Sequence, residues 1–290
     1  MKYRGIITPM VTPFSKDGSI DFEATKTLIE YLKGIGVSGL FPCGSTGLFS
    51  FMKFEERKNF LKYVIENADG LKVLAGVGSS STQEAIELGK FAAEAGADAL
   101  VLMPTYYITP GQPEIIRHFT DFITEVKKET FIYNIPQLCG SRIEPETVRK
   151  LKEEFSEVVG IKESSADMRY FSRLISLSGP DFSILQGQDD LLVPSMSIGA
   201  DGGVCGLSNF SSAVVNAYNE YDMGSRSKAS DIQVKQVDPL LHTLISATFP
   251  SGYYHAFYSK FGLKEGGYRS PMLEPDEETR KHISSALNPD

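Results

Sequence analysis

A short β-branched run ends in a lysine at Val158-Val159-Gly160-Ile161-Lys162-Glu163-Ser164-Ser165. Such a run is typical of a strand that is buried on both faces. Burying an ammonium group is costly, so a lysine at the end of a buried strand needs a reason. One interpretation is a Schiff-base nucleophile, because desolvation lowers the pKa of a lysine and frees its amine. The other is a strand-end charge that faces solvent or pairs with Glu163.

Apolar strand-like runs alternate with helical patterns on both sides of this stretch. Strands are predicted at residues 6–11, 39–43, 73–77, 99–103, 131–134, 158–162, 182–186 and 202–207. Helices are predicted between them at residues 21–33, 53–67, 81–95, 113–128, 145–154, 168–178 and 191–198. Strict alternation of this kind predicts a parallel sheet, and eight strands predict an α/β fold closed as a (β/α)8 TIM barrel. No Gly-x-Gly-x-x-Gly follows the first strand, which argues against a dinucleotide-binding sheet.

The last quarter of the chain lacks strand patterns. We therefore expect residues 1–215 to form the (β/α)8 barrel and residues 216–290 to form a C-terminal helical region packed on the barrel. A glycine- and proline-rich stretch at residues 262–271 interrupts these helices.

Charge and composition exclude several classes of function. The net charge is −8, whereas binding to nucleic acid requires a basic surface. The N-terminus does not resemble a signal peptide, and no apolar run is long enough to span a membrane. An odd number of cysteines without CxxC spacing favours reduced thiols in a cytoplasmic protein, with no role beyond packing for Cys43, Cys139 and Cys205.

Active sites of such barrels lie at the C-terminal ends of the strands, so the residues that each strand delivers there are candidates. Lys162 is the one lysine among them. The other candidates are Thr8, Pro9, Ser45, Thr46, Tyr106, Tyr107, Tyr133, Asn134, Glu163, Ser164, Gly187, Gln188, Asp189, Asp190, Gly206 and Ser208. A metal site is not expected, because none of the histidines falls at a strand end: His118, His242, His255 and His282.

Several of the other polar candidates also have a structural alternative. The loop Gly44-Ser45-Thr46-Gly47 offers hydroxyls and backbone N–H groups to a carboxylate or phosphate, yet it could be a plain βα turn. Tyr133 could relay protons beside an imine or be a core tyrosine. Asp189 and Asp190 could bind sugar hydroxyls or cap a helix.

Several spaced motifs together resemble the dihydrodipicolinate synthase / N-acetylneuraminate lyase family of pyruvate-dependent class I aldolases. The motifs extend over nearly the whole chain: Ile7-Thr8-Pro9 with Thr12-Pro13-Phe14, Gly44-Ser45-Thr46-Gly47, Tyr133-Asn134-Ile135-Pro136, Gly160-Ile161-Lys162 and Gly199-Ala200-Asp201-Gly202. This resemblance implies a cofactor-free imine on Lys162, a proton relay through Tyr133 and a pyruvyl carboxylate held by Ser45 and Thr46. It also implies a homotetramer in which Tyr107 serves a neighbouring site.

Departures from the family pattern indicate which member the chain is similar to. The stretch Gln137-Leu138-Cys139-Gly140 has no arginine, whereas lysine-pathway synthases use one there to grip a second substrate. The Leu-Cys-Gly part and the pair Asp189 and Asp190 resemble sialic acid lyases, which however carry a serine near Gly206. Leu48 and the segment 206–210 resemble the archaeal 2-keto-3-deoxygluconate aldolases.

The resemblance therefore implies a carbon–carbon lyase that cleaves 2-keto-3-deoxy sugar acids, and 2-keto-3-deoxygluconate first among them, to pyruvate and glyceraldehyde. Substrate contacts are expected from Thr8, Pro9, Ser45, Thr46, Ser164, Gly187, Asp189, Asp190 and Gly206. The alternatives are an N-acetylneuraminate lyase, a dihydrodipicolinate synthase, and a catalytically silent barrel that senses 2-oxo acids. The expected partners are a small 2-oxo acid and an aldehyde.

Overall fold

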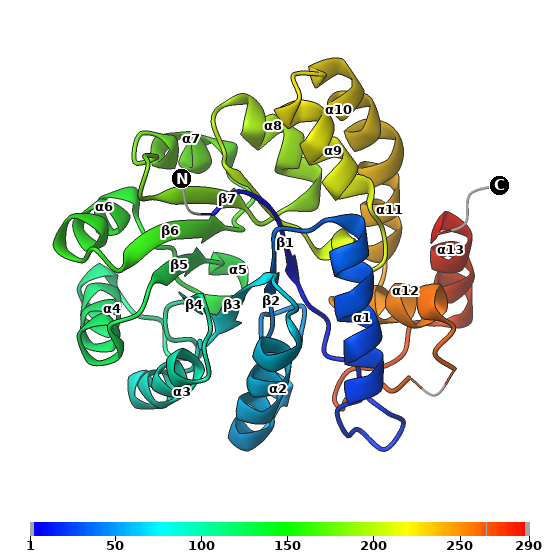
Figure 1. Cartoon of the computed structure of the whole chain (residues 1–290), viewed down its shortest axis with the longest axis horizontal. Helices are drawn as coiled ribbons and strands as arrows, with labels where there is room; N and C mark the ends of the chain where they lie inside the picture. Colours follow the sequence, from blue (N-terminus) through cyan, green and yellow to red (C-terminus); the bar gives the residue numbers. More distant parts are fainter. Residues whose placement is uncertain (1–2, 265, 288–290) are drawn as a thin grey trace.

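Eight parallel strands close into a barrel in the order of the sequence, as the alternating pattern predicted (Figure 1). The structure is a computed structural model that describes residues 3–264 and 266–287. The strands are β1 (Gly5–Pro9), β2 (Gly39–Phe41), β3 (Lys72–Gly76), β4 (Ala99–Leu102), β5 (Thr130–Asn134), β6 (Val158–Glu163), β7 (Ser183–Gln186) and β8 (Gly202–Val204). The pairing of β1 with β8 closes the ring.

The helices that follow the strands surround the barrel (Figure 1). They are α1 (Phe22–Ile35), α2 (Phe54–Asn67), α3 (Thr82–Glu94), α4 (Gln112–Val126), α6 (Pro145–Glu154), α7 (Met168–Ile175), α8 (Leu192–Ser197) and α9 (Ala213–Asp222). Polar caps set several starts: the side chains of Asp21, Ser81 and Asp167 accept hydrogen bonds from the first-turn N–H groups of α1, α3 and α7.

Short helical turns follow four strands at their C-terminal ends: η1 (Phe49–Phe51), α5 (Pro136–Cys139), η2 (Asp189–Leu191) and η3 (Gly206–Asn209). Sequence analysis did not predict α5, because a single helical turn shows no periodicity. It also extended the eighth strand to residue 207, whereas β8 ends at Val204. The reason is the Asp189 carboxylate, which accepts the N–H groups of Gly206 and Leu207 and thereby holds them in η3 instead of in a strand.

The C-terminal region is helical, as expected, and comprises α10 (Arg226–Ile232), a π-helical segment η4 (Gln233–Val237), α11 (Asp238–Leu244), α12 (Ser251–Phe261) and α13 (Glu277–Leu287). Figure 1 shows α11, α12 and α13 gathered on one side of the barrel, next to α1. Phe261 of α12 packs edge-on against Tyr31 of α1, with ring centroids 5.2 Å apart. The expected division between residues 215 and 216 falls inside α9, which packs on β1, and it stays a prediction.

The three cysteines are buried and free. Within residues 3–264 and 266–287, no helix combines the length and the apolar character that crossing a membrane requires. In the same ranges, histidine, cysteine, aspartate and glutamate side chains do not gather in threes in a way that could hold a metal ion.

Candidate active site

Lys162 projects from β6 into the interior of the barrel, where only 5% of it is exposed. Its Nζ lies 4.1 Å from the ring centroid of Tyr133 and 4.8 Å from that of Phe41. This enclosure lowers the pKa of Lys162 from 10.5 to about 7, chiefly by desolvation, although the nearby Asp189 acts in the opposite direction. A large fraction of the amine is therefore neutral near pH 7, which is the form that attacks a carbonyl.

Glu163, the next residue of β6, does not pair with Lys162, so that alternative is wrong. Successive strand side chains point to opposite faces, which sends Glu163 away from the barrel interior. Its carboxylate instead accepts hydrogen bonds from the side chain of Asn134 at 2.5 Å and from the backbone N–H of Ser165 at 2.6 Å. Asn134 in turn accepts the N–H of Ile143, so both residues brace the loops after β5 and β6.

Activity should fall with decreasing pH as the amine of Lys162 takes up its proton. Because the amine is active only when neutral, each pH unit below about 7 should lower kcat/KM for pyruvate release about tenfold. The Asp189 carboxyl, whose pKa burial raises to about 6, interacts with Lys162. The fall in kcat/KM at acid pH therefore reflects the titration of Lys162 and Asp189 together. Circular dichroism over the same pH range controls for unfolding. An acid limb with its midpoint near pH 10 would contradict the desolvated lysine.

The loop after β2 offers an anion site beside Tyr133. The backbone N–H groups of Ser45 and Thr46 have no hydrogen-bond partner in the part of the chain that the structure describes, and both residues line the central cavity. The Ser45 hydroxyl lies 3.5 Å from the Tyr133 hydroxyl. Burial raises the pKa of Tyr133 far above its usual value, so the phenol keeps its proton and suits a relay better than a free base.

Ser164 places a hydroxyl in the same cavity with no hydrogen-bond partner among the described residues. A buried hydroxyl without a partner is costly, which favours a ligand at this position. Gly187 makes room for it: a Cβ on Gly187 would lie 1.9 Å from the Ser164 Oγ. The Ser164 carbonyl is also held, because it accepts hydrogen bonds from the side chains of Gln137 and Gln188.

Asp189 joins the ends of β7 and β8 across the rim of the barrel. Its two carboxylate oxygens accept the N–H groups of Gly206 at 3.0 Å and Leu207 at 3.1 Å, and its carbonyl accepts the side-chain amide of Gln233. Burial raises its pKa to about 6, although the two backbone hydrogen bonds act in the opposite direction. Asp190 is half-buried, and burial raises its pKa too. Both side chains line the cavity.

The cavity above Lys162 has a volume of about 320 Å³. Most of the residues predicted from the sequence line it together, namely Pro9, Ser45, Thr46, Tyr133, Lys162, Ser164, Gly187, Asp189, Asp190 and Gly206. Lys162 is the only lysine or arginine on its wall within the described residues.

Six of the strand-end candidates do not line this cavity, namely Thr8, Tyr106, Tyr107, Asn134, Glu163 and Ser208. Thr8 is fully buried, and its Oγ1 lies 2.9 Å from the Ser208 hydroxyl, so it supports the rim from within the barrel. Tyr107 is 94% exposed, has a positive φ of 77° and is not part of the cavity wall of its own chain.

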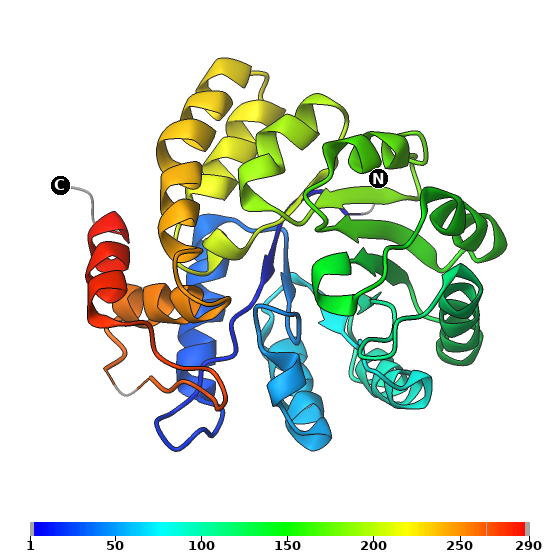
Figure 2. The ribbon, with the colours of Figure 1, turned by 180° about the vertical axis from the view of Figure 1, so that it is seen from behind.

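One wall of the cavity comes from the C-terminal region and was not predicted from the sequence. Tyr253 of α12, Phe249 before it, and Leu241 and Ile245 in and after α11 all line the cavity. Figure 2 shows α5 and the start of α12 on the near side of the barrel. No local signal in the sequence marks these residues, because they reach the site through the packing of helices.

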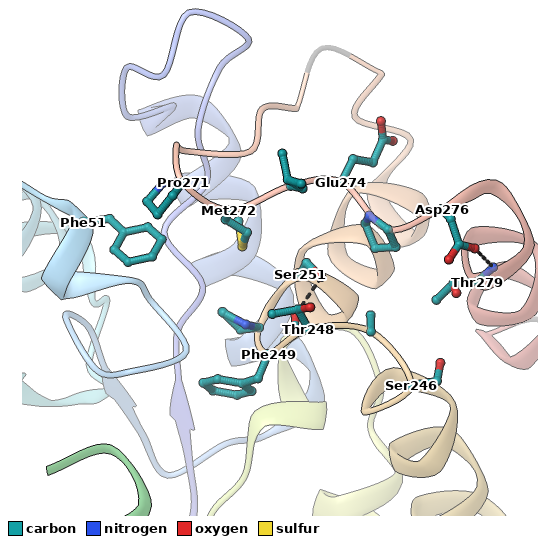
Figure 3. Close-up of a pocket in the computed structure, with 14 residues that line it drawn as sticks. Phe51, Ser246, Thr248, Phe249, Ser251, Pro271, Met272, Glu274, Asp276 and Thr279 are labelled. Atoms are coloured by element: carbon teal, nitrogen blue, oxygen red, sulfur yellow. Dashed lines mark hydrogen bonds between the residues drawn. The ribbon is translucent and has the colours of Figure 1, made fainter. Parts of the chain in front are cut away.

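A second hollow of about 460 Å³ lies beside the first, between the segment before α12 and residues 271–276. Figure 3 shows Phe51, Phe249 and Met272 around it. Phe249 also lines the cavity above Lys162, so this ring forms part of the wall between the two. Asp276 lines the second hollow, and hydrogen bonds from Thr279 lower the pKa of its exposed carboxyl, whereas burial shifts the pKa values of Lys162, Tyr133 and Asp189 in the first.

The sequence matches a known protein family and several individual proteins. Residues 2–289 match the model of the dihydrodipicolinate synthetase family. An uncharacterized DapA-like lyase of Thermoplasma acidophilum is 52% identical over 285 residues, which cover 98% of this chain and 97% of the relative. The 4-hydroxy-tetrahydrodipicolinate synthase of Oleidesulfovibrio alaskensis is 34% identical, and the match covers 99% of this chain and 98% of that one.

A further relative has both a named activity and a solved structure. The 2-dehydro-3-deoxy-D-gluconate/2-dehydro-3-deoxy-phosphogluconate aldolase of Picrophilus torridus is 48% identical over 263 residues, covering 91% of this chain and 97% of the relative. The structure of the 2-keto-3-deoxygluconate aldolase from the same organism superposes with a TM-score of 0.92, covering 94% of this chain and 98% of that one.

Proposed function

The chain belongs to the dihydrodipicolinate synthetase family and is a carbon–carbon lyase, and on that premise we propose that it cleaves 2-keto-3-deoxygluconate to pyruvate and glyceraldehyde. The observation that carries this proposal is the desolvated Lys162, which lies beside Tyr133 on the wall of the cavity. The relative of Picrophilus torridus, whose name gives aldolase activity on both this acid and its phosphorylated form, supports a 2-keto-3-deoxy sugar acid as the substrate.

The reaction begins with an imine. The neutral amine of Lys162 attacks the C2 carbonyl of the sugar acid, and loss of water leaves a protonated imine that draws electrons from C3. The carboxylate of the substrate lies on the N–H groups and hydroxyls of Ser45 and Thr46. No cofactor is needed, because the imine itself is the electron sink.

Cleavage then requires removal of the proton from the C4 hydroxyl. Tyr133 relays this proton through its own hydroxyl, and the substrate carboxylate is the group that receives it. The electron pair of the O–H bond forms the aldehyde carbonyl, the C3–C4 bond breaks, and its electrons form an enamine on Lys162. Protonation of C3 and hydrolysis of the imine release pyruvate and restore the amine.

The wall of the cavity favours an uncharged aldehyde half. A phosphate group needs cations or free N–H groups, yet Lys162 is used by the imine and the other ionisable groups on the wall are Asp189, Asp190 and two tyrosines. Arg142 pairs with Asp167 outside the cavity and offers no substitute. The same absence of an arginine from the wall disfavours a synthase that must grip a second carboxylate.

Pyruvate release should therefore be fastest from 2-keto-3-deoxygluconate. We expect kcat/KM for the 6-phosphorylated acid to be lower by about tenfold or more, because the buried carboxylate of Asp189 and the half-buried carboxylate of Asp190 repel the phosphate. N-acetylneuraminate, assayed side by side under identical conditions, tests the sialic acid lyase. Pyruvate from that substrate alone would show that Leu138, Cys139 and Gly140 were the better guide to function.

The proposal extends to assembly and place of action. Tyr107 and the next residue, Ile108, form an exposed apolar projection, and burial of such a projection favours contact with a second copy of the chain. We assign Tyr107 to a neighbouring site in a cytoplasmic homotetramer. Sedimentation of the protein as a monomer would contradict this part of the proposal.

A further inference from the structure

Tyr253 comes from α12, outside the eight strands, and lies over the end of β8. Its ring takes the space that a side chain at position 206 would need: a Cβ on Gly206 would lie 2.6 Å from the Tyr253 Cε1. Two aromatic rings hold it from the sides, with the centroids of Phe249 and Phe210 at 5.8 Å and 6.0 Å. Gly206 and Tyr253 thus form a fitted pair, in which the absence of a side chain at Gly206 leaves room for the Tyr253 ring.

Tyr253 is only 6% exposed, and no hydrogen bond joins its hydroxyl to another described residue; the oxygen is not among the fully buried atoms that lack a partner, so it is open to the cavity. Tyr253 also lines the cavity above Lys162, and a buried phenol normally finds a partner. Burial raises its pKa well above the usual value, and the charge of Asp189 adds to this effect. The phenol therefore stays protonated and can donate a hydrogen bond.

Resting on the proposed function, we propose that Tyr253 is the specificity-determining residue for the aldehyde half of the substrate, and that its phenol hydrogen-bonds a hydroxyl group there. The ring also limits how far the substrate can extend past Gly206. This position favours short aldehydes that carry hydroxyl groups over unsubstituted aldehydes of the same length.

The test removes a hydroxyl from the enzyme and, separately, from the substrate. Wild type and Tyr253→Phe are compared in the condensation of pyruvate with D-glyceraldehyde and with propanal, which has the same three carbons and no hydroxyl. We expect the variant to lose about tenfold or more in kcat/KM for glyceraldehyde and to change less than twofold for propanal. Borohydride trapping of pyruvate should be unchanged, because Lys162 and Tyr133 are intact.

Tyr258→Phe is the matched control on the same helix. Its hydroxyl bonds the Gly267 carbonyl at 2.7 Å and the Phe14 N–H at 3.2 Å, remote from the cavity. This variant should melt at a lower temperature with aldehyde selectivity unchanged. Gly206→Ala tests the fitted pair independently: its added methyl group should displace the Tyr253 ring and reduce selectivity for glyceraldehyde over propanal.

Two outcomes would overturn the inference alone. If Tyr253→Phe lowered kcat/KM equally for glyceraldehyde and propanal, the hydroxyl would have a structural role only. If kcat/KM were unchanged for both aldehydes, the hydroxyl would not contact the substrate. A wild-type protein that traps pyruvate but condenses it with neither aldehyde would overturn the proposed function as well. The experiment thus separates failure of the inference from failure of the function.

Discussion

Replacing Lys162 by methionine will abolish pyruvate release while leaving the barrel folded. Methionine has a similar length and no charge, so it fits between the rings of Phe41 and Tyr133 without the cost of a buried ammonium. Loss of the covalent path should lower kcat by on the order of 10⁴-fold or more. The measurement is pyruvate release from 2-keto-3-deoxygluconate, with borohydride trapping of radiolabelled pyruvate as the second readout.

Lys152→Met is the control for this substitution. The Nζ of Lys152 also lies over an aromatic ring, 5.2 Å from the centroid of Phe182, and it donates to the Leu177 carbonyl outside the cavity. Its loss should change stability slightly and leave activity intact. Full activity in Lys162→Met would refute the imine mechanism. A wild-type protein that never traps pyruvate would favour the silent barrel that only binds 2-oxo acids.

The Tyr133→Phe variant should retain pyruvate binding and lose cleavage. Its phenol is buried, protonated and 3.5 Å from the Ser45 hydroxyl, so removal of the oxygen breaks the path of the C4 proton without altering the ring beside Lys162. Loss of a positioned proton-transfer group costs about 10² to 10⁴-fold in kcat. Steady-state cleavage and single-turnover trapping with pyruvate, measured together, separate the two steps.

Tyr31→Phe serves as the control for loss of a partly buried tyrosine hydroxyl. Tyr31 lies in α1 and packs against Phe261, away from the cavity. Its kinetic constants should match those of the wild type. If Tyr133→Phe instead cleaved the sugar acid at the wild-type rate, the proton would have to leave through another group, and Ser164 would be the next to test.

The barrel was predictable because its signals are local. Each strand is a short apolar run, and helices begin at polar caps such as Asp21 and Ser81. Because βα connections are right-handed, eight such units in sequence close into a barrel. The same logic located Lys162 and Tyr133, since the ends of parallel strands must converge on one rim. The predicted ends of strands and helices differ from the observed ends by a few residues. β8 is shorter than predicted because the Asp189 carboxylate accepts the N–H groups of Gly206 and Leu207, which therefore lie in η3.

The sequence by itself therefore determined the fold, the family and most of the residues around the cavity. Only the tertiary structure decided that Lys162 is desolvated and that Thr8 and Tyr107 do not line the cavity. It also brought Tyr253 onto Gly206, a contact between positions 206 and 253 that no local pattern encodes. The physical reason is that burial and long-range packing depend on how whole elements meet, whereas periodicity and caps act within a few residues.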